Sequence, residues 1–510
     1  MTRTQKTMRN VRLSLLCQFV VLLTSVITRR FISDYTSVEY LSAGGLFSNI
    51  MTVLSLAELG IGTSITFSLY KPISDGDESK IRALMRLFKK AYTVIGIAVA
   101  ALGAALIPAL HLFVDDFDAV IAAIPNFYLI YGLYVVNAAA SYIAAYKRIL
   151  IIADQKKYIS SAVTAITKTL LCAASCAVLA LTQNYVIFMI CTVAATVGDN
   201  IAVAIIANKN YRYLKEKGDD TLSDDDKKTI KTNVSASMMH NVGGVLVNGT
   251  DNIIISRFVS FITEGIYTNY HLLSAAVDSV LAPIFQSATA SFGDLSVNAD
   301  GDRRREVYNR MFFAGAWLYG LCAICLFVLA KPFVLIWLGE GFEIDGLSVF
   351  LVSLNFYLLG MRRPGLVARD AMGLMRHDRW KSIAEAAINI VLSIVLAKYM
   401  GLSGVLLGTT LSSLLTCTWI EPYMLYKHGF KSGVGGFFLR YAAYTAVTAV
   451  AFASTALLCG LITFGGIGGL AVKLLIALTL PNAIYLAAYF KTDEFKYFYT
   501  YFFKKSSKQA

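Results

Sequence analysis

Apolar residues along the chain gather in fourteen blocks that are separated by short polar segments. Most blocks are about 20 residues long, the length that a helix needs to cross roughly 30 Å of hydrocarbon. Helices are expected because lipid cannot hydrogen-bond the free polar groups of an extended backbone. The predicted spans are 13–28, 40–70, 91–114, 119–146, 158–181, 184–207, 234–256, 265–293, 311–337, 346–361, 382–398, 402–426, 441–463 and 467–490.

Two blocks, 40–70 and 265–293, are longer than a membrane requires. We therefore expect these two helices to tilt, bend or extend beyond the bilayer. The pattern as a whole predicts an all-α polytopic membrane protein with about 14 transmembrane helices.

The distribution of Lys and Arg predicts the orientation of the chain. With the N-terminus inside, the cytoplasmic segments hold 39 of the 46 basic residues. This bias is typical of inner-membrane proteins and places both termini in the cytoplasm of a bacterial cell. It also accounts for the net charge of +13 without any nucleic-acid partner.

The chain divides into two similar halves. The segment Arg30–Ser33 is echoed by Arg257–Ser260, and Asp75-Gly76-Asp77 is echoed by Asp300-Gly301-Asp302 at a nearly constant offset. Six spans per half give both halves the same orientation, a common plan of transporters with a central cavity. The predicted domains are an N-lobe 1–209, a cytoplasmic linker 210–233, a C-lobe 234–430, and two additional spans with a cytoplasmic tail in 431–510.

Two segments resemble a known family. Residues 46–96, with AELGIG, and residues 250–273, with TDNIIIS, are similar to polysaccharide repeat-unit flippases of the O-antigen, capsule or teichoic type. These belong to the multidrug/oligosaccharidyl-lipid/polysaccharide exporter superfamily. The resemblance implies two six-helix lobes that open alternately to each side. It also implies that the cargo is an undecaprenyl-diphosphate-linked oligosaccharide for surface polysaccharide biosynthesis. Many members have twelve spans, so the last pair is a departure from the family.

A cargo of this kind needs cations in a polar cavity, because arginine binds phosphate oxygens with two parallel hydrogen bonds. Arg29 and Arg30 lie at the outer end of the first span, and Arg257 lies at the matching point of the seventh. Lys168 lies in the middle of the fifth span. We expect these four residues to bind the cargo, with an anchoring role at the membrane interface as the alternative for the arginines.

Ionisable residues inside a membrane are costly and usually have a partner or a function. Glu58, Asp199, Asp251 and Asp278 lie within predicted spans. Each is a candidate for coupling transport to protons or sodium ions or for lining the cavity. The structural alternatives are an ion pair of Glu58 with Lys168 or an arginine, and a hydrogen-bonded node at Asp251.

Other charged and reactive residues suggest no further chemistry. Glu385 and Glu421 lie near the inner ends of their spans, where we expect them at the surface. The eight cysteines lie in apolar blocks, and we expect them to pack in the membrane. No metal site or cofactor is predicted, and the chain has no nucleotide-binding GxxxxGK[ST] loop. The expected partners are the lipid-linked oligosaccharide, membrane lipids and, as an open alternative, polysaccharide polymerase or glycosyltransferase machinery.

Three other functions remain as alternatives. A lipid II flippase also has fourteen spans. A cation-coupled multidrug exporter of the same superfamily usually carries an acid in its first span, and residues 13–28 contain none. A membrane glycosyltransferase or polymerase needs acids on an outer loop, for which Asp115, Asp116 and Asp118 are a superficial match on a short segment. We therefore expect a transporter and not an enzyme.

Overall fold

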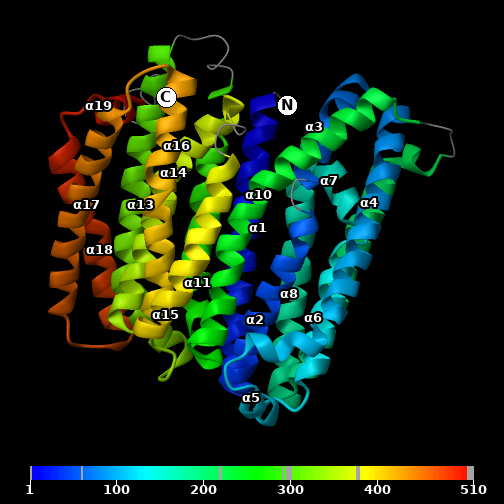
Figure 1. Cartoon of the computed structure of the whole chain (residues 1–510), viewed down its shortest axis with the longest axis horizontal. Helices are drawn as coiled ribbons and strands as arrows, with labels where there is room; N and C mark the ends of the chain where they lie inside the picture. The colour runs from blue at the N-terminus through cyan, green and yellow to red at the C-terminus, as the bar shows by residue number, and fades with distance from the viewer. Residues whose placement is uncertain are drawn as a thin grey trace. The chain divides into compact units, whose positions relative to one another are not determined.

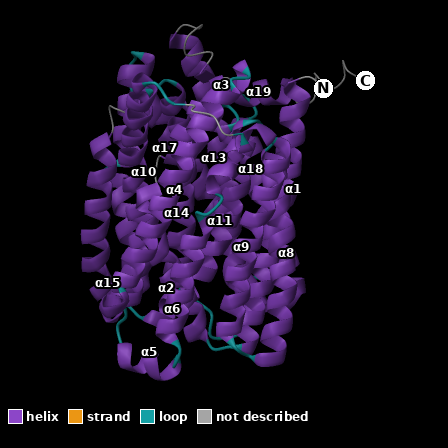
Figure 2. Ribbon diagram, turned by 90° about the vertical axis from the view of Figure 1, so that its right-hand side faces the viewer, coloured by secondary structure: helices purple, strands orange, loops and turns teal. Residues whose placement is uncertain are grey.

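The computed structural model describes residues 3–58, 61–216, 221–289, 292–293, 301–374 and 379–501. Every regular element in these residues is a helix, which confirms the all-α class (Figures 1 and 2). Eight of the helices are long and apolar enough to cross a membrane, and one bent pair of helices adds a ninth. The chain is therefore a multi-pass membrane protein.

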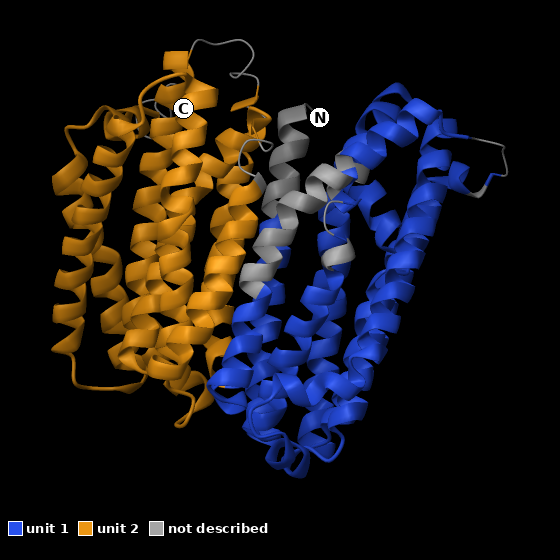
Figure 3. Cartoon of the chain, viewed as in Figure 1, with its two compact units in different colours: residues 1–265 blue, residues 266–510 orange. Residues whose placement is uncertain are grey.

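The chain forms two compact units, residues 1–265 and 266–510 (Figure 3). The elements of unit 1 are α1 (Arg3–Tyr35), α2 (Val38–Leu54), the 3-10 helix η1 (Ser55–Glu58), α3 (Ile61–Asp75), α4 (Glu78–Ala105), the 3-10 helix η2 (Ile107–Phe113), α5 (Phe117–Ala123), α6 (Phe127–Ser141), α7 (Ala145–Ala153), α8 (Lys157–Thr182), α9 (Tyr185–Asn210), the 3-10 helix η3 (Arg212–Lys215), α10 (Asp224–Phe258) and the first turn of α11 (Phe261–Gln286). Part of the predicted linker 210–233 is thus helical, because α10 begins at Asp224 behind the N-cap of Ser223.

Unit 2 continues from the rest of α11. Its further elements are α13 (Gly301–Leu338), α14 (Gly346–Ala371), α15 (Arg379–Leu415), α16 (Cys417–Met424), the π-helix η5 (Leu425–Phe430), α17 (Gly435–Gly460), α18 (Gly466–Tyr489) and α19 (Asp493–Tyr499). Part of the predicted span 265–293 and most of the segment before α13 lie outside the described residues.

The long block 40–70, for which we expect a tilt, a bend or an extension beyond the bilayer, is not one continuous α-helix. It consists of α2, the short η1 and α3. Tyr142 donates a hydrogen bond to Ser55 Oγ at the start of η1, with a distance of 2.9 Å. The interruption therefore occurs where polar side chains are available to bind one another.

The block 119–146, predicted as a single span, is divided into two helices. It contains α5 and α6, whose axes differ by 87°. Pro125 lies between the two helices, and a proline removes a backbone donor and disfavours helical geometry in the residue before it. Neither helix alone is long enough to cross a membrane, and the two have that length only as a pair.

Spans 382–398 and 402–426 form a helical hairpin. The range of α15 contains all of the first span and part of the second, but Gly401 has φ 56° and ψ −132°, which reverses the chain. After the reversal Ser393 donates a hydrogen bond to the carbonyl oxygen of Val405. Gly404 and Gly408, a GxxxG pair, lie against the backbone of the first arm, where a Cβ atom would collide. Small residues at this spacing allow helices in membranes to approach closely.

The additional helices α17 and α18 pack on α13 through aromatic side chains. Phe312 and Phe437 have ring centroids 4.9 Å apart, and Trp317 and Tyr485 have centroids 5.3 Å apart. A Cβ atom on Gly320 of α13 would lie 2.6 Å from the Tyr485 hydroxyl oxygen. The last two spans are thus an integral part of the core of unit 2.

Candidate functional site

The first predicted cations lie near the end of unit 1 where α1 leads into α2, which we call the α1–α2 end. Arg29 is half-buried, and its Nη2 donates a hydrogen bond to the carbonyl oxygen of Gly265 at 3.3 Å. Arg30 instead binds Asp34, with 2.7 Å between Nε and Oδ2 and with about 40% of each side chain exposed. The two neighbouring arginines therefore have different environments, and Arg29 is the one directed into the protein.

A buried acid close to Arg29 is Glu264, a residue that sequence reasoning missed. Glu264 lies in the first turn of α11, is 0% exposed, and directly precedes Gly265, whose carbonyl oxygen Arg29 binds. Neither of its carboxylate oxygens accepts a hydrogen bond from the described residues. A hint was present in the sequence, because Glu264 is an acid within the family-like segment 250–273, one residue before the predicted span 265–293.

Glycines of α2 form the surface against which the Glu264 carboxylate lies. A Cβ atom on Gly45 would lie 2.5 Å from Oε1 and 2.7 Å from Oε2 of Glu264. Gly265 packs equally closely against Ser42. Because these positions have no bulky side chain, the first turn of α11 reaches the backbone of α2 directly.

Two tyrosines complete the α1–α2 end. The hydroxyl groups of Tyr134 and Tyr185 are 3.1 Å apart, and a Cβ atom on Gly44 would lie 3.0 Å from each hydroxyl oxygen. Tyr185 also contacts Tyr40, with ring centroids 5.0 Å apart. The two hydroxyl groups and the Glu264 carboxylate thus lie against neighbouring glycines of α2.

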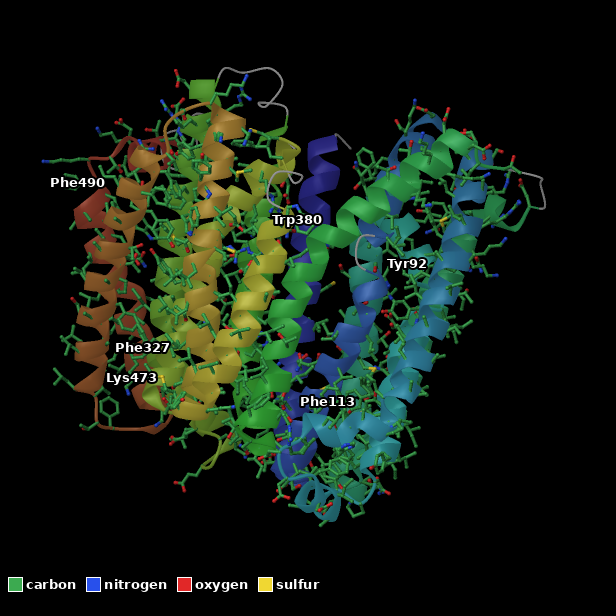
Figure 4. All side chains as sticks on the ribbon, in the orientation of Figure 1. Tyr92, Phe113, Phe327, Trp380, Lys473 and Phe490 are labelled. Atoms are coloured by element: carbon green, nitrogen blue, oxygen red, sulfur yellow. The ribbon has the colours of Figure 1, made fainter. Side chains whose placement is uncertain are left out.

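Arg257 is anchored to the backbone of unit 1. Its Nη1 donates a hydrogen bond to the carbonyl oxygen of Val114 at 2.9 Å, while Ser256 binds the carbonyl oxygen of Phe113 (labelled in Figure 4) at 2.8 Å. Asp115 accepts a hydrogen bond from the backbone N–H of Phe261. These bonds fix the connection between α10 and α11. They also give Asp115, one of the three acids that suggested an enzyme, a structural role.

Glu58 lies at the interruption of the second span. The Tyr92 hydroxyl (Tyr92 is labelled in Figure 4) donates a hydrogen bond to Glu58 Oε1 at 3.5 Å. The partner of Glu58 in the structure is therefore a tyrosine. Lys168, which the sequence offered as a partner, lies on the exposed side of α8. Both residues remain candidates for lining a transport pathway.

Asp199 of α9 forms an ion pair with Arg148 of α7. Arg148 also donates hydrogen bonds to Ser160 at 2.7 Å and to Thr164 at 3.0 Å. This network links three helices, so Asp199 has a structural partner that its sequence position did not reveal. Asp251 is also buried, with 8% of its surface exposed, next to buried Asn252.

In unit 2, Asp278 of α11 binds Arg363 of α14 and accepts a hydrogen bond from the Tyr319 hydroxyl at 2.9 Å. A Cβ atom on Gly360 would collide with the Tyr319 ring, which shows how closely α13 and α14 pack here. Asp278 is therefore paired in this conformation.

A second charged cluster in unit 2 corrects the expectation that Glu385 and Glu421 lie at the surface. Each residue is only 8% exposed. Arg362 donates two hydrogen bonds to Glu421, at 2.8 and 3.1 Å, and one to Glu385 at 3.2 Å. Lys381 binds both acids. The expectation was wrong because α14, α15 and α16 enclose these acids with two cations. Arg362 lies 23 and 59 positions away from them, and Lys381 lies one helical turn before Glu385.

Within the described residues, no group of three or more His, Cys, Asp or Glu side chains has an arrangement that could hold a metal ion. The predicted cations Arg29, Arg30, Arg257 and Lys168 all belong to unit 1.

The chain folds like known transporters. It matches the lipid II flippase MurJ in an inward closed conformation with a TM-score of 0.65 and 13% identity, over 94% of this chain and 99% of MurJ. It matches a multidrug resistance MATE family transporter of the MOP superfamily, in an inward-facing conformation, with a TM-score of 0.61 and 12% identity, over 82% of this chain and 98% of the transporter.

A third match is a point mutant of the Vibrio cholerae MATE transporter VcmN, with a TM-score of 0.58 and 15% identity over 84% of this chain and 99% of VcmN. No family model and no curated protein sequence matches the chain. The identities are low, so these likenesses establish the fold.

Proposed function

We propose that the protein is a flippase that moves an undecaprenyl-diphosphate-linked oligosaccharide across the bacterial cytoplasmic membrane by alternating access. Structures with this fold include inward-facing and outward-facing transporters, which supports a mechanism of this type. In this proposal the protein belongs to the exporter superfamily of MATE and MurJ, and both termini lie in the cytoplasm.

The extent of the structural likeness carries the choice of a lipid cargo. The lipid flippase MurJ covers 94% of the chain, whereas the two MATE matches described above cover 82% and 84%. The part of this chain that lies outside each of these MATE matches is similar in length to residues 431–510, which contain α17 and α18. A chain that extends beyond the drug-exporter core to the length of a lipid flippase is consistent with lipid transport.

The charges of unit 1 suit an anionic headgroup. An unpaired hydroxyl in hydrocarbon costs several kcal/mol and an unpaired charged phosphate far more, so the carrier must supply polar and cationic partners along the way. We propose that Arg29, Arg30, Arg257 and Lys168 supply cations to the diphosphate. Glu58, Asp199, Asp251 and Asp278 are the acids proposed to line the pathway or couple it to an ion gradient.

Lipid II is the second candidate cargo, since the flippase that the chain resembles carries it. Both cargos have an undecaprenyl diphosphate and differ in the attached sugars. The proposal for polysaccharide synthesis rests on the sequence resemblance of residues 46–96 and 250–273, and partners such as a polymerase or a glycosyltransferase follow from it.

A binding experiment distinguishes the cargo classes. The thermal unfolding midpoint of the purified protein in detergent is measured with an undecaprenyl-diphosphate oligosaccharide, with lipid II and with a cationic drug. A specific ligand raises the midpoint because it binds only the folded state. We expect the lipid-linked oligosaccharide to raise it most. Stabilisation by the cationic drug alone would refute the proposal in favour of a drug exporter, and stabilisation by lipid II alone would assign the protein to the second candidate.

A further inference from the structure

A polar cavity lies at one end of unit 2, between the N-terminal turns of α13, the start of α17 and the short helix α19. Its volume is about 380 Å³, and three arginines and four acids are among the residues that line it. The cavity adjoins the start of the predicted spans 311–337 and 441–463. The predicted topology therefore places it at the cytoplasmic surface of the membrane.

The charges that α13 contributes to the cavity are already paired with one another. Arg305 binds Asp302, with 3.0 Å between Nη2 and Oδ1, and Arg310 binds Glu306. The Arg310 guanidinium group also lies over the Tyr497 ring of α19, 3.7 Å from the ring centroid. This wall of the cavity is therefore electrically neutral.

Two other charges of the cavity, Arg440 of α17 and Glu494 of α19, are not paired in this way. Within the described residues, neither side chain makes an ion pair or a hydrogen bond, although both line the same cavity. The remaining acid, Asp493, is fully exposed and lies 3.8 Å from Lys496. The cavity thus offers a separate cation and a separate anion to a bound molecule.

Two uncharged groups add hydrogen-bonding capacity. Tyr426 of η5 is only 3% exposed, and its ring packs against Phe430 and Phe437, with centroids 5.1 and 5.7 Å apart. Its hydroxyl group makes no hydrogen bond in the described part of the chain, and the same is true of the amide of half-buried Asn309. Enclosed polar groups normally have a partner, so a buried tyrosine that lines a cavity with its hydroxyl group unbound indicates a ligand.

We propose that this cavity binds the headgroup of a zwitterionic phospholipid, an aminoalkyl phosphate such as that of phosphatidylethanolamine. Arg440, Tyr426 and Asn309 are donors that suit the phosphate oxygens. The Glu494 carboxylate is an acceptor that suits the ammonium group. A ligand with charge of one sign only would leave either Arg440 or Glu494 without a partner.

The surface next to the cavity favours a lipid over a soluble ligand. Leu439, the neighbour of Arg440, is 75% exposed. Val450 and Leu457 lie about three and five helical turns further along the same face of α17 and are 58% and 73% exposed. This apolar face gives the acyl chains a place beside the bound headgroup. The inference goes beyond the proposed function, because it concerns a resident lipid and not the cargo.

Equilibrium binding of radiolabelled phosphatidylethanolamine to the purified full-length protein in detergent tests the site. Arg440→Gln and Glu494→Gln each remove a charge-assisted hydrogen bond, so we expect each to raise Kd roughly tenfold. Tyr426→Phe keeps the ring packing and should raise Kd by a smaller factor. Lys231→Gln, which removes an exposed cation of α10, is the control and should leave Kd unchanged.

Phosphatidylglycerol, which has the phosphate but no ammonium group, separates the two roles. Arg440→Gln should weaken its binding as well, whereas Glu494→Gln should not. A folding defect does not produce this contrast, because it would weaken the binding of both lipids. Equal affinity of the wild-type protein for the two lipids, or an unchanged Kd for phosphatidylethanolamine in Glu494→Gln, would overturn the zwitterion site.

Free phosphoethanolamine distinguishes a lipid from a soluble ligand with the same headgroup chemistry. We expect it not to displace bound phosphatidylethanolamine at equal concentration, because it lacks the acyl chains that pack on α17. Displacement at equal concentration would assign the cavity to a soluble aminoalkyl phosphate and overturn the lipid site.

Discussion

At the scale of single residues, the buried charges of unit 2 form a closed set. Arg362 and Lys381 are shared between Glu385 and Glu421, and all four side chains are largely enclosed. A buried ion pair adds little net stability, but removing one member leaves an uncompensated charge. The cluster therefore fixes how α14, α15 and α16 pack.

Glu421→Gln should destabilise the protein by roughly 3–5 kcal/mol, since it leaves two buried cations with one acid. The measurement is denaturant-induced unfolding in detergent. The double variant Lys381→Met/Glu421→Gln should recover most of this loss, because Arg362 and Glu385 then remain as a neutral pair. Equal instability of the single and double variants would contradict a charge-based role.

The ion-pair partners of the acids could not be predicted from the sequence. The sequence singled out Asp199 and Asp278 as membrane acids, but their partners Arg148 and Arg363 lie 51 and 85 positions away from them. The position of Glu264 next to Gly45 also depends on how helices from distant segments pack. Ion pairing in a membrane protein is a property of the tertiary structure, whereas hydropathy reports only each residue's immediate sequence environment.

At the scale of elements, the reversal at Gly401 depends on glycine. Its φ of 56° with ψ of −132° is a region that side chains disfavour strongly. Gly401→Ala should therefore destabilise the hairpin by about 1–3 kcal/mol in the same unfolding experiment. Gly460→Ala, at the end of α17 with open space around it, is the control and should have little effect.

The start of α14 predicts a dependence on pH. Burial raises the pKa of Asp345, but hydrogen bonds from Ser348 and Ser403 outweigh it, and the net effect lowers this pKa below its ordinary value. A group whose pKa is lower in the folded state stabilises the protein above its unfolded pKa, and this contribution is lost as pH falls through the folded pKa.

Asp345→Ala should therefore cost about 1 kcal/mol at neutral pH, because it also removes the N-cap that accepts from Ser348 N–H. The difference from the wild type should shrink as pH falls below the ordinary pKa of aspartate. Thermal unfolding at a series of pH values measures it, and a constant difference across that range would disagree with a charged cap.

Elements were predicted well where hydropathy alone determines them. Each of the fourteen apolar blocks corresponds to helical structure in its described residues, which leave out 59–60 of one block and 290–291 of another. The angle of 87° between α5 and α6 was not predicted, because Pro125 permits a bend without specifying its size. Tertiary contacts determine such angles.

At the scale of the whole molecule, the predicted orientation can be tested directly. All eight native cysteines are buried or half-buried, so background labelling is low. Asp225→Cys should react with an impermeant maleimide only from the cytoplasmic side, and Glu340→Cys only from the outside; both positions are exposed. Reaction of both from one side would contradict the topology, and detergent-permeabilised cells provide the control for reactivity.

The central claim is that the protein moves a lipid-linked sugar between leaflets. Proteoliposomes that contain a fluorescent undecaprenyl-diphosphate oligosaccharide report this movement as protection of the headgroup from an impermeant quencher. We predict faster equilibration between leaflets with the protein than in empty vesicles, and a reduced rate for Arg29→Gln. Equal rates with and without folded wild-type protein, with and without an imposed ion gradient, would contradict the account.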